Sequence, residues 1–284
     1  MEPILRRVTE RDLPALRALR LEVGWQAHDW ALRDAMRPPH AAFFGVDEGG
    51  RLVAIGSGIA YGRLGIVGNM VVAADRRRAG LGSRVLVAVL EFLEERGTER
   101  VELFATADGR RLYQRFGFVP LTESAMVVIP PDAVAATAGT SEIEIRSAGP
   151  DDLARISAYD LPRYGADRSP ILSSALADPE RPALVAMRDG ALAGYAVLRP
   201  AGSRIGPWLA DGTVAAGALL QGFAGATPPG EPLSTNLPGE NGEGRDWLAR
   251  LGAGITPTDG RMARGREISR RLDTIYGNAI GALG

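Results

Sequence analysis

The chain of 284 residues contains no cysteine and only two histidines, His28 and His40. Without cysteine it cannot form disulfides, thiolate metal sites or a cysteine nucleophile, and two histidines are too few for a histidine-based metal cluster. We therefore expect no metal, and we expect any catalysis to rely on oxygen acids and bases or on the positioning of substrates.

The sequence also lacks a long apolar run and a large net charge. Its N-terminus, Met-Glu-Pro, has no apolar signal core, and no stretch is long and apolar enough to span a bilayer. The formal net charge is −1, so no global field attracts nucleic acid or membrane. With 45% hydrophobic and 24% charged residues, the composition is typical of globular proteins. We expect a cytoplasmic protein with no nucleic-acid or membrane partner.

Lysine is absent as well, which helps to distinguish between phosphate-binding loops. An apolar strand ending at Val72 leads into an Arg- and Gly-rich turn, Asp75 to Ser83, and then into an amphipathic helix over 81–96. Glycines let backbone N–H groups converge, and the first helical turn adds unpaired donors and a favourable dipole. Arginines add charge-assisted donors. The pattern indicates an anion site; the alternative is a solvated arginine run, which would place positive charge unfavourably at a helix N-terminus.

Two common phosphate loops do not fit this turn. The P-loop requires a lysine after its last glycine, and the dinucleotide fingerprint requires three glycines, of which only Gly80 and Gly82 are present. The remaining pattern, Arg77-x-x-Gly80-x-Gly82, resembles the acyl-coenzyme A pyrophosphate loop of GNAT acetyltransferases. This resemblance implies that the backbone of the preceding strand hydrogen-bonds to the pantetheine arm of the coenzyme, which pairs with it like an additional β-strand. The side chain of Val71 can at the same time belong to the core. The implied coenzyme residues are Met70, Val71, Val72, Arg77, Arg78, Ala79, Gly80, Leu81, Gly82 and Ser83.

Residues 107–118 resemble the short helix and Gly-Phe turn of the same family. There a tyrosine four residues before the glycine faces the coenzyme sulfur, and Tyr113 stands at that place before Gly117. A phenol with a pKa of about 10 can protonate a departing thiolate without being ionised at neutral pH. The alternative is a tyrosine that only anchors the helix. Thr106 stands where the family often has a coenzyme-binding asparagine, so we include it among the coenzyme residues.

The resemblance leaves the general base open. Many family members carry a glutamate on the strand before the loop, but residues 64–70 contain no carboxylate. A water chain, Asp29 or His28 must remove the acceptor's proton, or the acceptor amine has a low pKa. The segment around these two residues follows the first helix, where the family forms one wall of the acceptor pocket. Its candidate substrate residues, Trp25, His28, Asp29 and Trp30, would suit a flat, partly apolar or cationic acceptor; alternatively, the tryptophans pack under the helices and Asp29 caps one.

The second half repeats the first at an offset of about 140 residues. Asp12-Leu13 matches Asp152-Leu153, and Gly50-x-Leu52 matches Gly190-x-Leu192. The phosphate loop is missing from the second copy, and Leu248 stands at the place of Tyr113. We expect a catalytic domain over 1–130, a linker over 131–141 and a second domain over 142–284. The second domain resembles the degenerate C-terminal domain of bacterial tandem GNAT proteins.

The resemblance implies an α/β fold with two tandem GNAT-like domains. Each would be a twisted, mostly antiparallel sheet with a splayed central strand pair and flanking helices. It also implies an enzyme that transfers an acetyl group from acetyl-CoA to a primary amine of a small molecule, directly in a ternary complex, with the N–H of Val71 or a neighbour polarising the thioester. We expect a monomer or homodimer. The alternative is a non-catalytic acyl-CoA sensor or scaffold. Nucleic-acid binding through Arg76 to Arg78 is disfavoured, because no aromatic stripe accompanies them.

Overall fold

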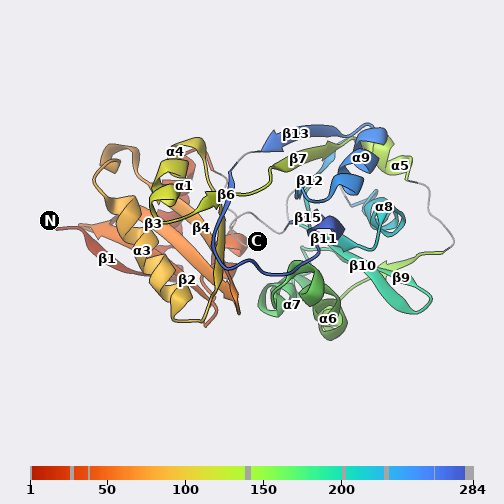
Figure 1. Cartoon of the computed structure of the whole chain (residues 1–284), viewed down its shortest axis with the longest axis horizontal. Helices are drawn as coiled ribbons and strands as arrows, with labels where there is room; N and C mark the ends of the chain where they lie inside the picture. Colours follow the sequence, from red (N-terminus) through yellow and green to blue (C-terminus); the bar gives the residue numbers. More distant parts are fainter. Residues whose placement is uncertain are drawn as a thin grey trace. The chain divides into compact units, whose positions relative to one another are not determined.

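The computed structural model describes residues 2–25, 29–37, 39–137, 142–199, 203–226, 230–258 and 260–278. The chain forms two compact units, coloured along the sequence in Figure 1. Unit 1 holds Met1–Leu121 together with Gly260–Ile268, and unit 2 holds Thr122–Asp259 together with Ser269–Ala279. Unit 1 therefore contains a segment that is distant from the rest of that unit in the sequence.

Unit 1 is built on one seven-stranded sheet in the order β1-β2-β3-β4-β5-β14-β6. All neighbours pair antiparallel except β4 and β5, which are parallel. The strands are β1 (Ile4–Val8), β2 (Ala41–Glu48), β3 (Arg51–Tyr61), β4 (Leu64–Val72), β5 (Arg100–Phe104), β6 (Val119–Pro120) and β14 (Arg261–Gly265). The helices are α1 (Leu13–Glu22), α2 (Asp29–Asp34), α3 (Leu81–Glu94) and α4 (Ala107–Arg115), with short 3-10 turns at Glu10–Asp12 and Ala74–Arg76.

Helices cover both faces of this sheet. Helix α3 buries its apolar stripe against β2, β3 and β4, and Gly58 lets it approach closely, since a Cβ there would lie 3.0 Å from Cγ1 of Val89. The neighbouring side chain, Ser57, points to the opposite face, because side chains alternate along a strand. Asn69 links Ser57 to Arg20 of α1 by hydrogen bonds, which places α1 on that second face.

Strands β4 and β5 separate after a short paired stretch. They pair only between Leu64–Val67 and Arg100–Leu103, whereas β4 continues to Val72. The register between β3 and β4 shifts at this same point, and Asn69 adopts a left-handed φ of 55° there. Such a bulge bends the strand away from its neighbour. The last residues of β4 thus pair with β3 on one side and, within the part of the chain that the structure describes, with no strand on the other.

Unit 2 contains a five-stranded and a three-stranded sheet. The five-stranded sheet has the order β15-β11-β10-β9-β8, and the three-stranded sheet has the order β12-β7-β13. The strands are β7 (Ser124–Ile129), β8 (Glu144–Ser147), β9 (Ala183–Arg188), β10 (Ala191–Leu198), β11 (Ile205–Ala210), β12 (Leu233–Leu237), β13 (Gly254–Thr258) and β15 (Ile275–Gly277). The helices are α5 (Pro131–Ala135), α6 (Leu153–Tyr164), α7 (Ser169–Ala177), α8 (Thr213–Gly222) and α9 (Gly242–Arg250), with 3-10 turns at Pro150–Asp152 and Leu272–Thr274.

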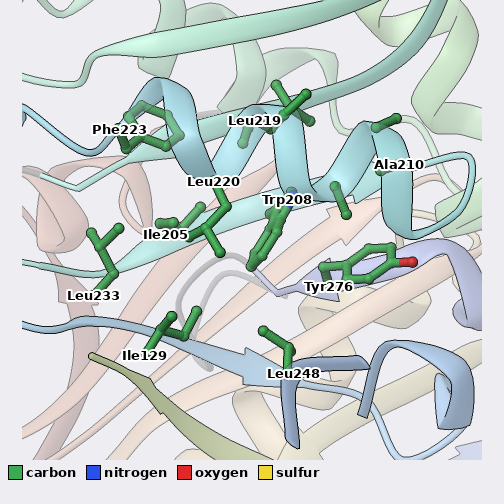
Figure 2. Close-up of a cluster of buried hydrophobic side chains, with 14 of the residues drawn as sticks. Ile129, Ile205, Trp208, Ala210, Leu219, Leu220, Phe223, Leu233, Leu248 and Tyr276 are labelled. Atoms are coloured by element: carbon green, nitrogen blue, oxygen red, sulfur yellow. The ribbon is translucent and has the colours of Figure 1, made fainter. Parts of the chain in front are cut away.

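The core of unit 2 collects side chains from both of its sheets and from α8. Figure 2 shows Trp208 of β11 and Tyr276 of β15 near one another below this helix, and their ring centroids are 5.3 Å apart. Leu248 of α9 reaches the same cluster and is fully buried. The residue at the repeat position of Tyr113 is therefore a core residue.

One strand of each half pairs within the unit built mainly from the other half. Strand β7 comes from the first half and lies between β12 and β13 in unit 2. Strand β14 comes from the second half and lies between β5 and β6 in unit 1. Since β12 and β13 repeat β5 and β6, the two strands occupy equivalent places, and the exchange is reciprocal.

The α/β fold with mostly antiparallel sheets agrees with the sequence prediction. Part of the predicted linker 131–141 is helix α5, whose Ala133 and Val134 are buried in the core of unit 2; residues 138–141 lie outside the described chain. The division into domains 1–130 and 142–284 remains a prediction about the repeat, and the compact units combine segments from both. No described helix is long and apolar enough to cross a membrane.

Candidate functional site

The Arg- and Gly-rich turn forms an open N-terminus for α3. Gly80, with a φ of 78°, is its N-cap residue, and no side chain caps the helix. The first backbone hydrogen bond runs from Arg84 N–H to Gly80 O. The N–H groups of Leu81, Gly82 and Ser83 precede it, so the helix itself provides no acceptor for them. These three donors, with the helix dipole, suit an anion.

The three consecutive arginines of the turn have different surroundings. Arg76 is bound to Glu48 at 2.7 Å. Arg77 and Arg78 are exposed, and their side chains make no ion pair or hydrogen bond with any residue in the described ranges. Arg78 holds a left-handed φ of 65°, which is uncommon for a residue with a side chain. Arg77 and Arg78 are thus the cations available to a bound anion.

The end of β4 and helix α4 meet the first turn of α3. A Cβ on Gly82 would lie 3.5 Å from Cγ2 of Val72 and 3.5 Å from Cδ2 of Leu112. Ala79 is exposed beside them, and Met70 and Val72 are half-buried, while the Val71 side chain is buried. The structure therefore brings together the three segments in which the sequence places coenzyme residues.

Hydrogen bonding to β3 fixes which backbone groups of β4 face the open side. Ala73 N–H donates to Val53 O at 2.9 Å, and Val71 pairs with Ile55. Because N–H groups two residues apart point the same way, the N–H of Val71 also faces β3. The N–H of Val72, between them, faces the unpaired side. Of the candidates for polarising a carbonyl in the opening, Val72 is favoured over Val71.

A chain of polar side chains supports the bulge in β4. Arg20 donates to Oδ1 of Asn69, and Nδ2 of Asn69 donates to Oγ of Ser57 at 2.8 Å. Burial lowers the pKa of Arg20 from its usual value, and its guanidinium lies 5.3 Å from the centroid of the Trp25 ring. Sequence reasoning did not single out Asn69, because only its left-handed backbone and buried bonds reveal its role.

Tyr113 lies in α4 with its ring buried against Phe118, at a centroid distance of 5.9 Å. Burial raises the pKa of Tyr113 to about 12. Among the residues that the structure describes, none forms a hydrogen bond with its hydroxyl. The phenol therefore stays protonated at neutral pH and keeps its proton available for a ligand. Thr106 caps the same helix, and its Oγ1 accepts a hydrogen bond from Gly109 N–H at 3.3 Å.

The predicted substrate residues have different environments. Asp29 begins α2 and is bound by Arg17 at 2.6 Å, so its carboxylate is already engaged. Trp25 stacks against Arg20, and Trp30 is half-buried in α2. His28 lies outside the described residues.

Glu102 is a buried carboxylate that the sequence prediction overlooked. It lies on β5 opposite Ile66, one position before the pairing of β4 and β5 ends. Arg100 Nε donates to its Oε1 at 2.6 Å, and Nη2 of Arg261, on β14, lies 3.5 Å from its Oε2. The family's usual glutamate lies on the strand before the loop, whereas here the carboxylate lies on the next strand, in the alternating stretch 100–104, whose charged residues are its signal in the sequence. Within the described ranges, no cluster of three or more histidine, aspartate or glutamate residues could hold a metal ion.

Comparison with known proteins gives two family matches on this chain. The "Acetyltransferase (GNAT) family" matches residues 8–118, and an "Acetyltransferase (GNAT) domain" matches residues 156–277. An uncharacterised N-acetyltransferase of Bacillus subtilis strain 168, YitH, is 26% identical over 213 residues, which are 74% of this chain and 73% of the relative.

Two solved structures share the fold. A crystal structure of a Pyrococcus horikoshii protein superimposes with a TM-score of 0.83 at 18% identity and covers 99% of this chain and 96% of that one. A tandem GNAT protein from the clavulanic acid biosynthesis pathway superimposes with a TM-score of 0.65 at 15% identity, covering 93% and 98% of the two chains. At these identities the likeness supports the fold alone.

Proposed function

Because this chain belongs to the GNAT acetyltransferases and carries two such domains in tandem, we propose that unit 1 transfers an acetyl group from acetyl-CoA to a primary amine of a small-molecule acceptor. The observation that carries the proposal is the opening between β4 and β5, which ends at the uncapped N-terminus of α3. An extended arm that contains amide groups fits the opening between the strands, and a diphosphate fits the N-terminus of α3.

In this proposal the coenzyme is held mainly by the backbone. Its pantetheine amides pair with the unpaired side of Met70–Val72, as an added strand would. Its diphosphate accepts hydrogen bonds from the N–H groups of Leu81, Gly82 and Ser83, and Arg77 and Arg78 neutralise its charge. Ala79 and Gly80 shape the turn between these groups, and Thr106 lies at the start of the neighbouring helix.

The acetyl transfer then needs three steps. The neutral acceptor amine attacks the thioester carbonyl, whose developing negative charge is stabilised by the N–H of Val72. The tetrahedral intermediate expels the coenzyme thiolate, and the Tyr113 phenol protonates the sulfur. The nitrogen gives up its extra proton, and the tyrosinate regains one from solvent. The products are an amide and free coenzyme A.

We propose that water, and no side chain, accepts the extra proton that the nitrogen carries after its attack. Three carboxylates of unit 1 that could act as the base already have partners: Asp29 has Arg17, Glu102 has Arg100 and Arg261, and Glu22 accepts from Ala74 N–H at 3.1 Å. No carboxylate among the described residues of β4 can take that role either. The acceptor then has to reach the site as the neutral amine.

The direct test is release of free thiol from acetyl-CoA over a panel of polyamines, amino acids, aminoglycosides and peptide amines. The protein suits this assay, since it has no cysteine to react with the thiol reagent and no lysine side chain to accept acetyl groups. We expect amine-dependent thiol release with at least one class. Tight acetyl-CoA binding without turnover on any amine would support a non-catalytic sensor or scaffold instead.

A further inference from the structure

Unit 2 contains the counterpart of the opening in unit 1. In the repeat, β11 corresponds to β4 and β12 to β5. Arg204 and Ser234 form a parallel bridge that corresponds to the Leu64–Arg100 pair at the start of β4 and β5. Beyond that bridge, β11 pairs with β10 and β15, and β12 pairs with β7. The two strands of unit 2 therefore separate in the same way as those of unit 1.

The strand β15 fills this opening. It pairs antiparallel with β11, where Trp208 lies opposite Gly277 and Leu209 lies opposite Ile275. On the other wall, Asn278 N–H donates to Asn236 O at 3.1 Å, and Oγ1 of Thr235 lies 3.0 Å from the carbonyl oxygen of Tyr276. The segment thus hydrogen-bonds to both separated strands.

The side chains of β15 fit the opening closely. Ile275 and Tyr276 are buried, and Figure 2 shows Tyr276 within the core of unit 2. At Gly277 a Cβ would collide with Oγ1 of Thr235 and would lie 3.0 Å from the carbonyl oxygen of Ile205. A glycine is the residue that lets the backbone approach both walls at once.

Asn241 binds β15 from the position that corresponds to Thr106. Both residues cap equivalent helices with the same bond: Oδ1 of Asn241 accepts from Gly244 N–H at 2.8 Å, as Thr106 accepts from Gly109 N–H. The Nδ2 group of Asn241 donates to Ile275 O at 3.0 Å. An amide side chain at this position therefore holds a peptide carbonyl of the chain itself.

The start of α8 resembles that of α3 in its N-cap glycine, Gly212, and in having no side-chain cap among the described residues, but its turn lacks arginine. Here β11 leads to Asp211, Gly212 and Thr213, with no arginine in the turn. Asp211 lies next to the N-cap of α8, and its carboxylate accepts two hydrogen bonds from Arg163, the shorter of which is 2.7 Å. This turn therefore supplies no cation to a diphosphate, unlike Arg77 and Arg78 in unit 1, and its carboxylate is already paired with Arg163.

We propose that β15 is an internal occupant of the second coenzyme opening and takes the place that the pantetheine arm takes in unit 1. Both are extended chains whose amide groups pair with a separated strand. The chain accordingly binds one acyl-CoA, in unit 1, while unit 2 is closed by its own strand. The inference about β15 rests on the geometry of unit 2, and only the binding ratio rests on the proposed function.

Hydrogen exchange of the full chain, with and without acetyl-CoA, tests the proposal. We expect peptides over 205–210 and 272–278 to be protected without ligand and unchanged by saturating acetyl-CoA, and we expect equilibrium dialysis to give one coenzyme per chain. Gly277→Val should accelerate exchange of both peptides at least tenfold and leave β4 and α3 unchanged. The control Asp273→Ala alters a neighbouring exposed carboxylate and should change neither.

Thr235→Val provides a milder variant that removes one hydroxyl at nearly constant volume. It should accelerate exchange of 272–278 and leave 64–72 unchanged. Fast exchange of 272–278 in the unmodified protein, or a second equivalent of acetyl-CoA that protects 205–210, would overturn the proposal. If acetyl-CoA protects no peptide at all while β15 stays protected, the proposed function fails and the occupancy of the opening stands.

Discussion

Arg261 and Glu102 are 159 positions apart in the sequence, yet Nη2 of Arg261 lies 3.5 Å from Oε2 of Glu102 inside unit 1. The contact exists because β14 pairs with β5, which places Arg261 opposite Phe104. Arg100 binds the same carboxylate from β5 itself. One buried glutamate thus connects a strand of each half of the chain.

Glu102→Gln should destabilise the protein by about 3 kcal/mol, because it leaves two buried guanidiniums without their shared carboxylate. The free energy of unfolding from urea titration measures this change. The matched control is Glu99→Gln, since Glu99 pairs with Arg63 at the surface and should leave the unfolding midpoint unchanged. Equal midpoints for both variants would show that the buried cluster does not contribute to stability.

The reciprocal exchange of β7 and β14 predicts that neither half folds alone. A fragment over 1–139 lacks β14 and exposes the apolar side chains of β7, while a fragment over 140–284 leaves β12 and β13 without their central strand. We expect each fragment to aggregate when expressed alone, and we expect the two to purify as a soluble complex through a tag on one when expressed together. A soluble 1–139 fragment with cooperative unfolding would contradict the exchange.

Local elements of this fold follow from the sequence, whereas the pairing of distant strands does not. Apolar spacing predicts a helix from Leu81, which α3 confirms, and the apolar strand that is predicted to end at Val72 matches β4. No local pattern in the sequence shows that β7 pairs with β12. Pairing depends on which edges are free in three dimensions, and alternation within one strand does not encode it.

Within the candidate site, motif spacing identifies the turn and Tyr113 but not the supporting residues. Gly80 and Gly82 are recognisable because their spacing is a backbone requirement. Glu102 and Asn69 depend on burial and on partners from other elements, which the sequence does not display. The role of β15 was equally hidden, since a short strand near the end of the chain has no motif of its own.

Arg77→Ala should weaken acetyl-CoA binding roughly tenfold or more, because a charge-assisted hydrogen bond to phosphate contributes about 1.5–3 kcal/mol. Arg78→Gly should act in the same direction while keeping the left-handed backbone at that position. Arg76→Ala is the matched control, since Arg76 is bound to Glu48 and should leave the Kd within twofold. Isothermal titration at two salt concentrations measures the effect, and equal losses for Arg76 and Arg77 would remove Arg77 from the diphosphate site.

Tyr113→Phe should lower kcat by about two orders of magnitude and leave the KM for acetyl-CoA within threefold, because it removes only the proton donor to the leaving thiolate. The fold should be unaffected, since the hydroxyl bonds to no residue that the structure describes. Steady-state thiol release and thermal unfolding of both proteins check the two statements. An unchanged kcat would exclude Tyr113 from proton transfer.

The pH profile separates water-assisted proton removal from an enzyme base. An ordinary alkylamine with a pKa of about 10 is neutral in only about one molecule per thousand at pH 7, so kcat/KM should rise tenfold per pH unit up to the pKa of the acceptor. Tyr113 acts in its protonated form, and since burial raises its pKa to about 12, its activity as an acid is lost only as the pH rises through that value. The profile should therefore show no descending limb below about pH 11.

A series of amines provides the second comparison. An amine of lower pKa should reach its plateau of kcat/KM at a lower pH, so the pH of the inflection should equal the pKa of each acceptor. An inflection fixed near pH 6 to 7 for every amine would instead reveal a titrating group of the protein that acts as the base.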